Sequence, residues 1–277
     1  MSLIMKCVIV GLGYFGKIIQ SKLKEHFSVD ELITIDPFNT NANFKYISDV
    51  QSIDGYWFVT TPASTHHSIL LELFQKGVKN IWIEKPICNT LDDTLDIFSK
   101  KPDNVFLYCD FTWLQHEAIK ELGNLSDIKH IEMKWMNDGS MIPKDVNIVT
   151  DLAVHPISIL TFLLIKSKDI LEKINVTYAN DMSVLINGFS KNGITFNIEV
   201  SNSSSIKTRN ISLYCSDQVY RWFSDDQYYI ENLGSFESKD AIVSNIELFL
   251  SKNSLGYPLD IARTLETVNE LFANFNK

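Results

Sequence analysis

The sequence has few arginines and no excess of basic charge. Its arginines are Arg209, Arg221 and Arg263, and its 277 residues carry a formal net charge of −9 at pH 7. Nucleic acids and anionic membrane surfaces are bound by clustered basic side chains, so this charge balance argues against both classes of partner. We expect a small-molecule ligand instead.

Cysteine is also scarce, and its spacing is uninformative for metals. Cys7, Cys88, Cys109 and Cys215 form no C-x-x-C pair, and three of them fall in or beside apolar, strand-like runs. Such cysteines are typical of reduced thiols in the core of a cytoplasmic protein. We therefore expect neither a disulfide nor a metal site.

Long hydrophobic segments are absent too. The longest apolar run, 157–165 with one threonine, is far too short to cross a bilayer. Gly11 interrupts the apolar start of the chain and no A-x-A-like site follows it, which argues against a signal peptide. We see no repeats or low-complexity linker. The length suits two modest domains in a cytoplasmic protein without membrane contact.

What is present begins with a glycine pattern. Cys7–Val10 is a short β-branched run typical of a buried strand, and Gly11, Gly13 and Gly16 follow it with G-x-G-x-x-G spacing. The spacing predicts a tight turn, a close backbone approach to a pyrophosphate and close helix packing, in that order. The helix expected over 14–26 would direct its free N–H groups at the phosphates.

An acidic residue stands where this motif needs one. The apolar run 32–35 predicts a second strand, and it ends at Asp36, 20 residues after Gly16. A carboxylate there accepts a ribose 2′-OH and repels a 2′-phosphate, so NAD is favoured over NADP. No Lys or Arg follows Asp36 before Lys45. The plainer alternative is a turn residue at a strand end, because Pro37 comes next.

The order of elements predicts the fold class. Strand and helix alternate as far as about residue 110, which indicates a doubly wound parallel Rossmann sheet. Strand-like runs then follow one another with only turns between them, which predicts a mainly antiparallel open sheet packed on helices. We expect an NAD-binding domain at 1–112 and a substrate-binding and oligomerisation α+β domain at 113–277. The final helices, about 239–250 and 259–275, could pack back on the first domain.

Three residues could carry chemistry. Lys85 follows a predicted parallel strand, on the sheet edge where α/β proteins bind ligands, and a desolvated lysine can stabilise a developing oxygen charge. Asp151 and His155 are four residues apart and share a face if both are helical. A histidine of near-neutral pKa can take the proton of an alcohol. Taken singly, a lysine at a strand end is usually a solvated charge, and an aspartate and a histidine four residues apart are usually a pair on a helix surface.

Together these motifs resemble the glucose–fructose oxidoreductase / inositol dehydrogenase / MocA (Gfo/Idh/MocA) family over essentially the whole chain. The most specific part runs from Thr61-Pro62 through His66 to Glu84-Lys85-Pro86. The resemblance implies an NAD(P)-dependent oxidoreductase acting on sugars, sugar nucleotides or cyclitols. It implies that His155 is the acid/base, that Lys85 holds the reacting oxygen and the nicotinamide ribose, and that Asp151 orients them. The cofactor-binding residues are then expected to be Gly11, Gly13, Tyr14, Phe15, Gly16, Asp36, Thr60, Thr61, Pro62, His66, Glu84 and Lys85.

Some stretches depart from the family pattern. Asn147-Ile148-Val149-Thr150 stands where relatives have glycines, and Asp110-Phe111-Thr112-Trp113 where they commonly have an arginine. Pro156 follows His155 directly. It either kinks a continuous helix, by removing the hydrogen bond to the Leu152 carbonyl, or opens the helix with His155 as its cap.

Substrate contacts are expected at the domain junction. Aromatic and amide side chains there would suit a sugar ring, although core packing and a turn explain them equally well. Arg209 and Lys207 could meet a substrate phosphate, but a solvated sheet face is the favoured interpretation. The candidate substrate residues are Trp113, Trp135, Asn137 and Asp138.

The sequence therefore predicts an NAD-dependent oxidoreductase that moves a hydride between nicotinamide and a secondary alcohol or ketone of a sugar-like substrate. One alternative is an NADPH-dependent imine or bilin-type reductase on the same scaffold. Another is a non-catalytic dinucleotide-binding sensor or accessory subunit. We also expect a homodimer or higher homo-oligomer through the antiparallel sheet, because an alternating apolar face needs cover.

Overall fold

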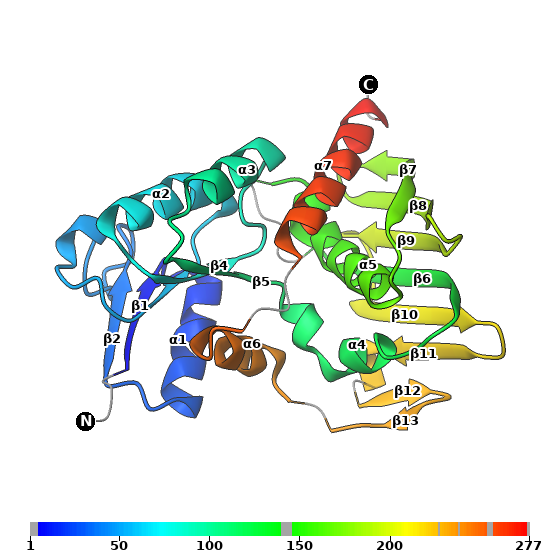
Figure 1. Cartoon of the computed structure of the whole chain (residues 1–277), viewed down its shortest axis with the longest axis horizontal. Helices are drawn as coiled ribbons and strands as arrows, with labels where there is room; N and C mark the ends of the chain where they lie inside the picture. The colour runs from blue at the N-terminus through cyan, green and yellow to red at the C-terminus, as the bar shows by residue number, and fades with distance from the viewer. Residues whose placement is uncertain (1–4, 140–145, 227, 238, 254–256, 276–277) are drawn as a thin grey trace. The chain divides into compact units, whose positions relative to one another are not determined.

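The computed structural model describes residues 5–139, 146–226, 228–237, 239–253 and 257–275 (Figure 1). The chain forms two compact units. Unit 1 comprises Met1–Phe111 with Ile242–Pro258, and unit 2 comprises Thr112–Ala241 with Leu259–Lys277. A stretch from near the end of the chain is therefore part of the first unit.

Unit 1 is built on a parallel sheet. The described residues form five strands in the order β2-β1-β3-β4-β5, and every neighbouring pair is parallel. The predicted doubly wound Rossmann sheet is confirmed. Its elements are β1 (Lys6–Val10), α1 (Tyr14–His26), β2 (Glu31–Ile35), β3 (Tyr56–Val59), α2 (His66–Lys76), β4 (Asn80–Glu84), α3 (Leu91–Lys100), β5 (Phe106–Asp110) and α6 (Ala241–Leu250).

Helices cover both faces of this sheet, which is why its strands are apolar throughout. Leu70 and Leu73 of α2 and Ile97 of α3 pack with one face. Helices α1 and α6 cover the other, where Phe249 of α6 is fully buried against aromatic rings of β3 and β5. Helix α6 thus closes a core that the first 111 residues leave open on that side.

Unit 2 is built on a larger, mainly antiparallel sheet, as predicted. Its described residues form eight strands in the order β13-β12-β11-β10-β6-β9-β8-β7. The pair β6 and β9 is parallel and the others are antiparallel. Its elements are α4 (Glu117–Leu122), β6 (Ile128–Met136), α5 (Val154–Lys166), β7 (Leu171–Asn180), β8 (Ser183–Ser190), β9 (Thr195–Ser201), β10 (Thr208–Cys215), β11 (Val219–Phe223), β12 (Tyr229–Glu231), β13 (Gly234–Ser235) and α7 (Pro258–Phe275).

The helix that carries the predicted acid/base is the most apolar in unit 2. A π-helical turn, Val149–Ala153, runs directly into α5. The continuous run Val149–Lys166 is long and apolar enough to cross a membrane by length and composition, but 78% of it is buried inside the protein. Burial of this extent is typical of a core helix.

The face of the unit 2 sheet away from its core is largely polar. The apolar residues of the alternating strands are buried, as Ile131, Met133 and Trp135 are on β6. Glu132 and Lys134 alternate with them and are exposed. The apolar side of the alternation on β6 forms the core of unit 2. The expected association of subunits through this sheet stays a prediction.

Candidate functional site

A pocket of about 850 Å³ lies at the carboxyl ends of β1, β2 and β3. Ligands of open α/β sheets bind at this edge, and the order β2-β1-β3 makes β1 and β3 the point where the winding reverses. The pocket is lined by six of the predicted cofactor residues, namely Gly11, Gly13, Asp36, Thr60, Thr61 and Pro62.

The three glycines fit the roles that the motif assigns them. Gly11 has φ +94°, and a Cβ on Gly16 would lie 2.0 Å from the Gly11 carbonyl oxygen. Both positions therefore require glycine for the turn itself. Gly13 differs, because a Cβ there would meet nothing within 4 Å. Its bare backbone faces open space in the pocket, as a seat for a diphosphate requires.

Asp36 holds the glycine turn as well as lining the pocket. Its Oδ2 accepts a hydrogen bond from the Leu12 N–H at 2.8 Å, and its Oδ1 accepts from Phe38 N–H at 2.8 Å and Asn39 N–H at 2.9 Å. Asn39 in turn donates from Nδ2 to the Leu12 carbonyl at 2.9 Å. A carboxylate offers about four lone-pair sites, so acceptor capacity remains for a ribose hydroxyl. The turn and ribose interpretations of Asp36 are thus compatible.

Thr60, which lines the pocket, and His66 both hold neighbouring loops together. The Thr60 hydroxyl donates to the Gly11 carbonyl at 2.6 Å, which ties β3 to the glycine turn. His66 has no exposed surface; its Nε2 lies 2.9 Å from the Thr61 carbonyl oxygen and its Nδ1 lies 2.8 Å from that of Pro86. The His66 side chain thus joins the loops after β3 and β4, and its contact with the cofactor stays a prediction.

The remaining cofactor candidates lie near the pocket without lining it. Tyr14 begins α1 and is 69% exposed, whereas Phe15 stacks on Trp82 with ring centroids 6.0 Å apart. Glu84 ends β4, and Lys85 follows it at the same sheet edge; both are half-buried. Sequence reasoning missed Leu12, inside the glycine motif, and several residues of the loop after β2, which carry no motif. The loop residues that line the pocket include Phe38, Asn39, Thr40, Lys45, Tyr46 and Ser48.

In unit 2, the partly exposed side chains of Asp151 and His155 interrupt an otherwise buried part of the chain. From Ile148 to Leu164 every residue is buried except these two, which are half-buried. The π turn before Pro156 lets the helix continue through a position without an N–H donor. Of the two alternatives for Pro156, the continuous helix is observed, and His155 is helical rather than a cap.

The aromatic residues near the start of unit 2 form a cluster. Trp113 packs edge-on against Trp135 with ring centroids 4.9 Å apart, and His155 lies 6.2 Å from Trp135. Trp135 is fully buried and Asp138 is exposed. The half-buried Asn137 accepts a hydrogen bond from Arg209 Nη2 at 2.6 Å. The favoured interpretation of Arg209, a solvated sheet face, is wrong, since the side chain is only 7% exposed.

The cysteines form no disulfide with one another. All four are free thiols, and burial raises the pKa of Cys7 and of Cys88 to about 12, so neither is reactive. Within the described ranges, no three His, Cys, Asp or Glu side chains are grouped as a metal site would need.

Comparison with known proteins assigns the family. Residues 5–101 match the model of the GFO_IDH_MocA oxidoreductase family, described as an NAD-binding Rossmann fold. The predicted family, its oxidoreductase class and NAD as its cofactor are thereby confirmed. No curated protein sequence matches the chain.

Solved structures of similar fold extend over the whole chain. UDP-N-acetylglucosamine 3-dehydrogenase GnnA from Acidithiobacillus ferrooxidans has a TM-score of 0.81 at 15% identity, covering 99% of this chain and 100% of GnnA. Myo-inositol dehydrogenase from Lactobacillus casei, in complex with NAD(H) and myo-inositol, has a TM-score of 0.78 at 15% identity, with 98% and 95% covered. At these identities the likeness establishes the Gfo/Idh/MocA fold of both units.

The residues present fit NAD. The glycine turn with its open backbone at Gly13 would hold the diphosphate, and Asp36 would accept the adenosine ribose hydroxyl. Lys45, the first basic residue after Asp36 in the sequence, lines the same pocket.

Proposed function

We propose that this protein is an NAD-dependent dehydrogenase that interconverts a secondary alcohol and a ketone on a sugar, sugar nucleotide or cyclitol. The observation that carries the proposal is that Asp151 and His155, four residues apart, are the two residues of the stretch 148–164 that are not buried. Because both side chains are partly exposed, the imidazole of His155 can accept a proton and the carboxylate of Asp151 can orient it.

The residue roles follow from elementary acid–base chemistry. When bound, NAD supplies the hydride acceptor. His155 takes the hydroxyl proton of the alcohol as its carbon loses hydride, and returns it in the reverse direction. Lys85 donates a hydrogen bond to the reacting oxygen, which gains negative charge as the proton leaves. Asp151 balances the charge of protonated His155 and fixes its orientation.

The solved relatives support the substrate class. GnnA is a UDP-N-acetylglucosamine 3-dehydrogenase and the Lactobacillus casei enzyme is a myo-inositol dehydrogenase, and both of these molecules bear ring hydroxyl groups. Trp113 is half-buried and packs on Trp135 beside His155, and its indole suits the apolar face of such a ring.

An absorbance screen at the reduced-nicotinamide band tests the proposal. Sugars, uronic acids, cyclitols and nucleotide sugars are each incubated with NAD or NADP and the wild-type protein. We expect turnover with NAD of at least one compound, and a loss of about 100-fold or more in kcat for Lys85→Met and His155→Asn, since both groups act in the transition state. His130→Asn on the other face of the unit 2 sheet is the matched control and keeps full activity.

The outcomes separate the rivals. Turnover with NADPH that is indifferent to His155→Asn indicates the imine or bilin-type reductase. Tight NAD binding, measured by calorimetry, without turnover of any compound indicates the sensor or accessory subunit. Unchanged activity in Lys85→Met removes the assignment of that lysine.

We also propose a cytoplasmic homo-oligomer joined through the polar face of the unit 2 sheet. Exposed apolar side chains occur there on β7 and β8: Tyr178 (45%) lies directly opposite Leu185 (38%), and Phe189 (40%) is four residues further along β8. Glu132 and Lys134 add charges of both signs on the same sheet. Light scattering should give at least a dimer mass that Leu185→Asp reduces to a monomer. A monomeric wild type contradicts the proposal.

A further inference from the structure

Arg209 is the most unusual charged residue in unit 2. It lies on β10 directly opposite Trp135 of β6, and its guanidinium carbon sits 5.3 Å from the centroid of that indole. Its side chain is on the buried face of the sheet, next to Ile211 and Leu213. A guanidinium removed from water to this extent is costly unless its charge and its N–H groups are satisfied.

The guanidinium of Arg209 has more hydrogen-bond donors than acceptors around it. Its Nη1 donates to the carbonyls of Met136 and of Thr208, the latter at 2.8 Å, and its Nη2 donates to Asn137 Oδ1. A guanidinium has five N–H donors, so two are left. One is Nε–H, which is buried and has no acceptor in the described part of the chain. The other is the second hydrogen of Nη2.

The charge is uncompensated as well. All three acceptors are neutral oxygens, and among the described residues no carboxylate forms an ion pair with Arg209. Burial lowers its pKa to about 10, and no neighbouring acid opposes that shift. The other two arginines differ in this respect, since Arg221 pairs with Glu231 at 3.0 Å and Arg263 with Asp260 at 3.6 Å.

The location connects this cation to the proposed acid/base. Trp135 is the shared neighbour of Arg209 and His155, with the latter ring 6.2 Å away. Trp113 and His155 are the half-buried members of this cluster, so a sugar-sized ligand against them lies next to the neighbour of Arg209. In a guanidinium, Nε–H and one Nη–H lie side by side and match the two oxygens of a carboxylate or phosphate.

We propose that Arg209 binds an anionic group of the substrate, a carboxylate or a phosphate, so that the protein acts on acidic or phosphorylated sugars in preference to neutral ones. This inference rests on the proposed function, because the bound anion is a substrate only if the protein is a dehydrogenase. Binding of the anion can be tested without turnover.

The direct test is nuclear magnetic resonance of the arginine Nε–H groups in the presence of NAD. Three arginines give three signals, and Arg209→Lys identifies one of them by its loss. Probes are glucuronate, galacturonate, glucose 6-phosphate and UDP-N-acetylglucosamine, each against glucose, galactose and myo-inositol. We expect an anionic probe to shift the Arg209 signal and leave Arg221 and Arg263 unchanged, with no shift from neutral compounds. If no anionic probe shifts it, or if neutral compounds shift it equally, the inference is overturned.

A kinetic comparison separates anion binding by Arg209 from a purely structural role, in which its hydrogen bonds only hold neighbouring strands together. Arg209→Met should raise KM for the anionic substrate about 10- to 100-fold, as expected for charge-assisted hydrogen bonds, and leave the constants of its neutral analogue unchanged. Arg209→Lys should recover part of the loss, because it keeps the charge and loses the fork. Arg221→Met is the silent control. A purely structural role would lower Tm and affect both analogues equally.

The two proposals fail separately. An Arg209 signal that responds to an anion while no compound is oxidised keeps the anion site and removes the dehydrogenase. Oxidation of neutral sugars alone, with an Arg209 signal that does not respond, keeps the dehydrogenase and removes the anion site.

Discussion

At the scale of single residues, the glycines of the opening turn differ in what they permit. Gly16 has no room for a side chain, because its Cβ would overlap the Gly11 carbonyl, whereas Gly13 has open space in front of it. The two positions therefore separate folding from cofactor binding, although both belong to one motif.

Gly13→Ala should fold as the wild type does and bind NAD at least 10-fold more weakly, because the added methyl occupies the place of the diphosphate. Thermal unfolding and calorimetric titration with NAD measure the two effects. Gly16→Ala is the comparison, and we expect it to fold poorly. Wild-type affinity in Gly13→Ala would place the diphosphate elsewhere.

A buried histidine makes stability depend on pH. The Nδ1 of His116 accepts a hydrogen bond from the Ala118 N–H at 3.2 Å, which requires an unprotonated nitrogen, and burial lowers its pKa below the ordinary 6.5. The unfolded chain therefore takes up this proton at a higher pH than the folded one. The stabilisation is complete above about pH 6.5 and is lost as the pH falls below that value.

His116→Asn keeps a capping side chain but cannot titrate. We expect a lower overall stability, since the contact of the ring with Trp222 is lost, and a shallower decline between pH 6.5 and 5. Urea unfolding at several pH values measures the slope. An unchanged slope would show that another group titrates.

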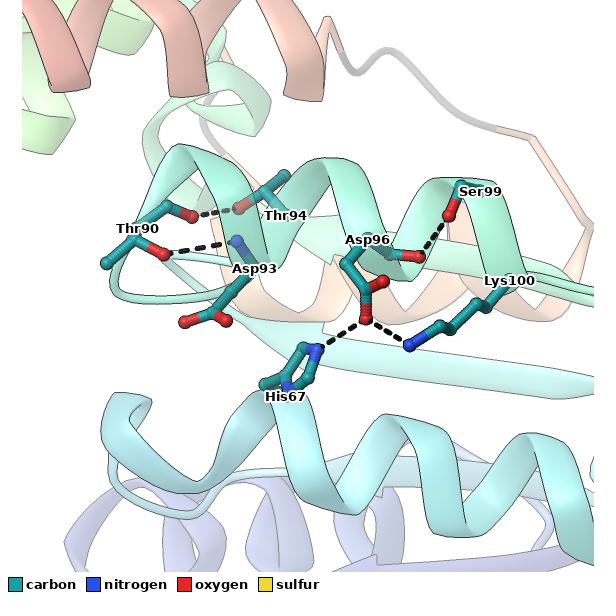
Figure 2. Close-up of polar contacts among 7 residues, drawn as sticks. All are labelled: His67, Thr90, Asp93, Thr94, Asp96, Ser99 and Lys100. Carbon is teal, nitrogen blue, oxygen red and sulfur yellow. Dashed lines mark hydrogen bonds and ion pairs between the residues drawn. The ribbon is translucent and has the colours of Figure 1, made fainter.

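At the scale of elements, α2 and α3 are joined by one acidic residue. Asp96 of α3 accepts from His67 of α2 and from Lys100 one turn along its own helix, both at 2.8 Å, as Figure 2 shows. Thr90 caps the start of α3 by accepting from the Asp93 N–H. The hydrogen bonds from Lys100 and His67 lower the pKa of Asp96 below 3.8.

Because the folded pKa is depressed, this contact stabilises the protein above about pH 4 and is lost as the pH falls further. Asp96→Asn should therefore lower Tm at pH 7 and have little effect near pH 3, where the wild-type carboxyl is also protonated. Parallel thermal melts at both pH values test this. A difference that persists at pH 3 would assign the effect to packing instead.

At the scale of the whole molecule, unit 1 is built from two segments that lie far apart in the sequence. Helix α6 follows the last strand of unit 2 in sequence, but its Phe249 is fully buried in unit 1, and its Asn245 accepts a hydrogen bond from Tyr108 of β5. The cofactor-binding unit therefore depends on residues near the end of the chain.

Phe249→Ala should destabilise unit 1 by about 3–5 kcal/mol, the usual cost of removing a buried phenylalanine. The transition that NAD shifts to higher temperature identifies unit 1 in calorimetric melts, and this transition should move down. Phe272→Ala on α7 is the matched control in unit 2. If NAD raises the transition that Phe272→Ala lowers, and Phe249→Ala spares it, the assignment of α6 is contradicted.

Local patterns in the sequence were sufficient for the fold class, because hydrophobic period and turn residues act over a few positions. The glycine turn, the parallel alternation up to residue 110 and the strands after it could all be predicted in this way. Asp36 and the residues 11, 13 and 60–62 at the pocket were predicted too, since strand ends of a parallel sheet share one edge.

What tertiary structure alone decided is which side of each element is buried and what lies against it. The pattern of β10 allowed Arg209 to face solvent, and only the pairing of β10 with β6 places it against Trp135. Nothing in the motif of His66 indicated that its two ring nitrogens would lie between the loops after β3 and β4. Residues distant in sequence create these environments, and a buried charge or a fully bonded imidazole is a property of the neighbours it acquires in the fold.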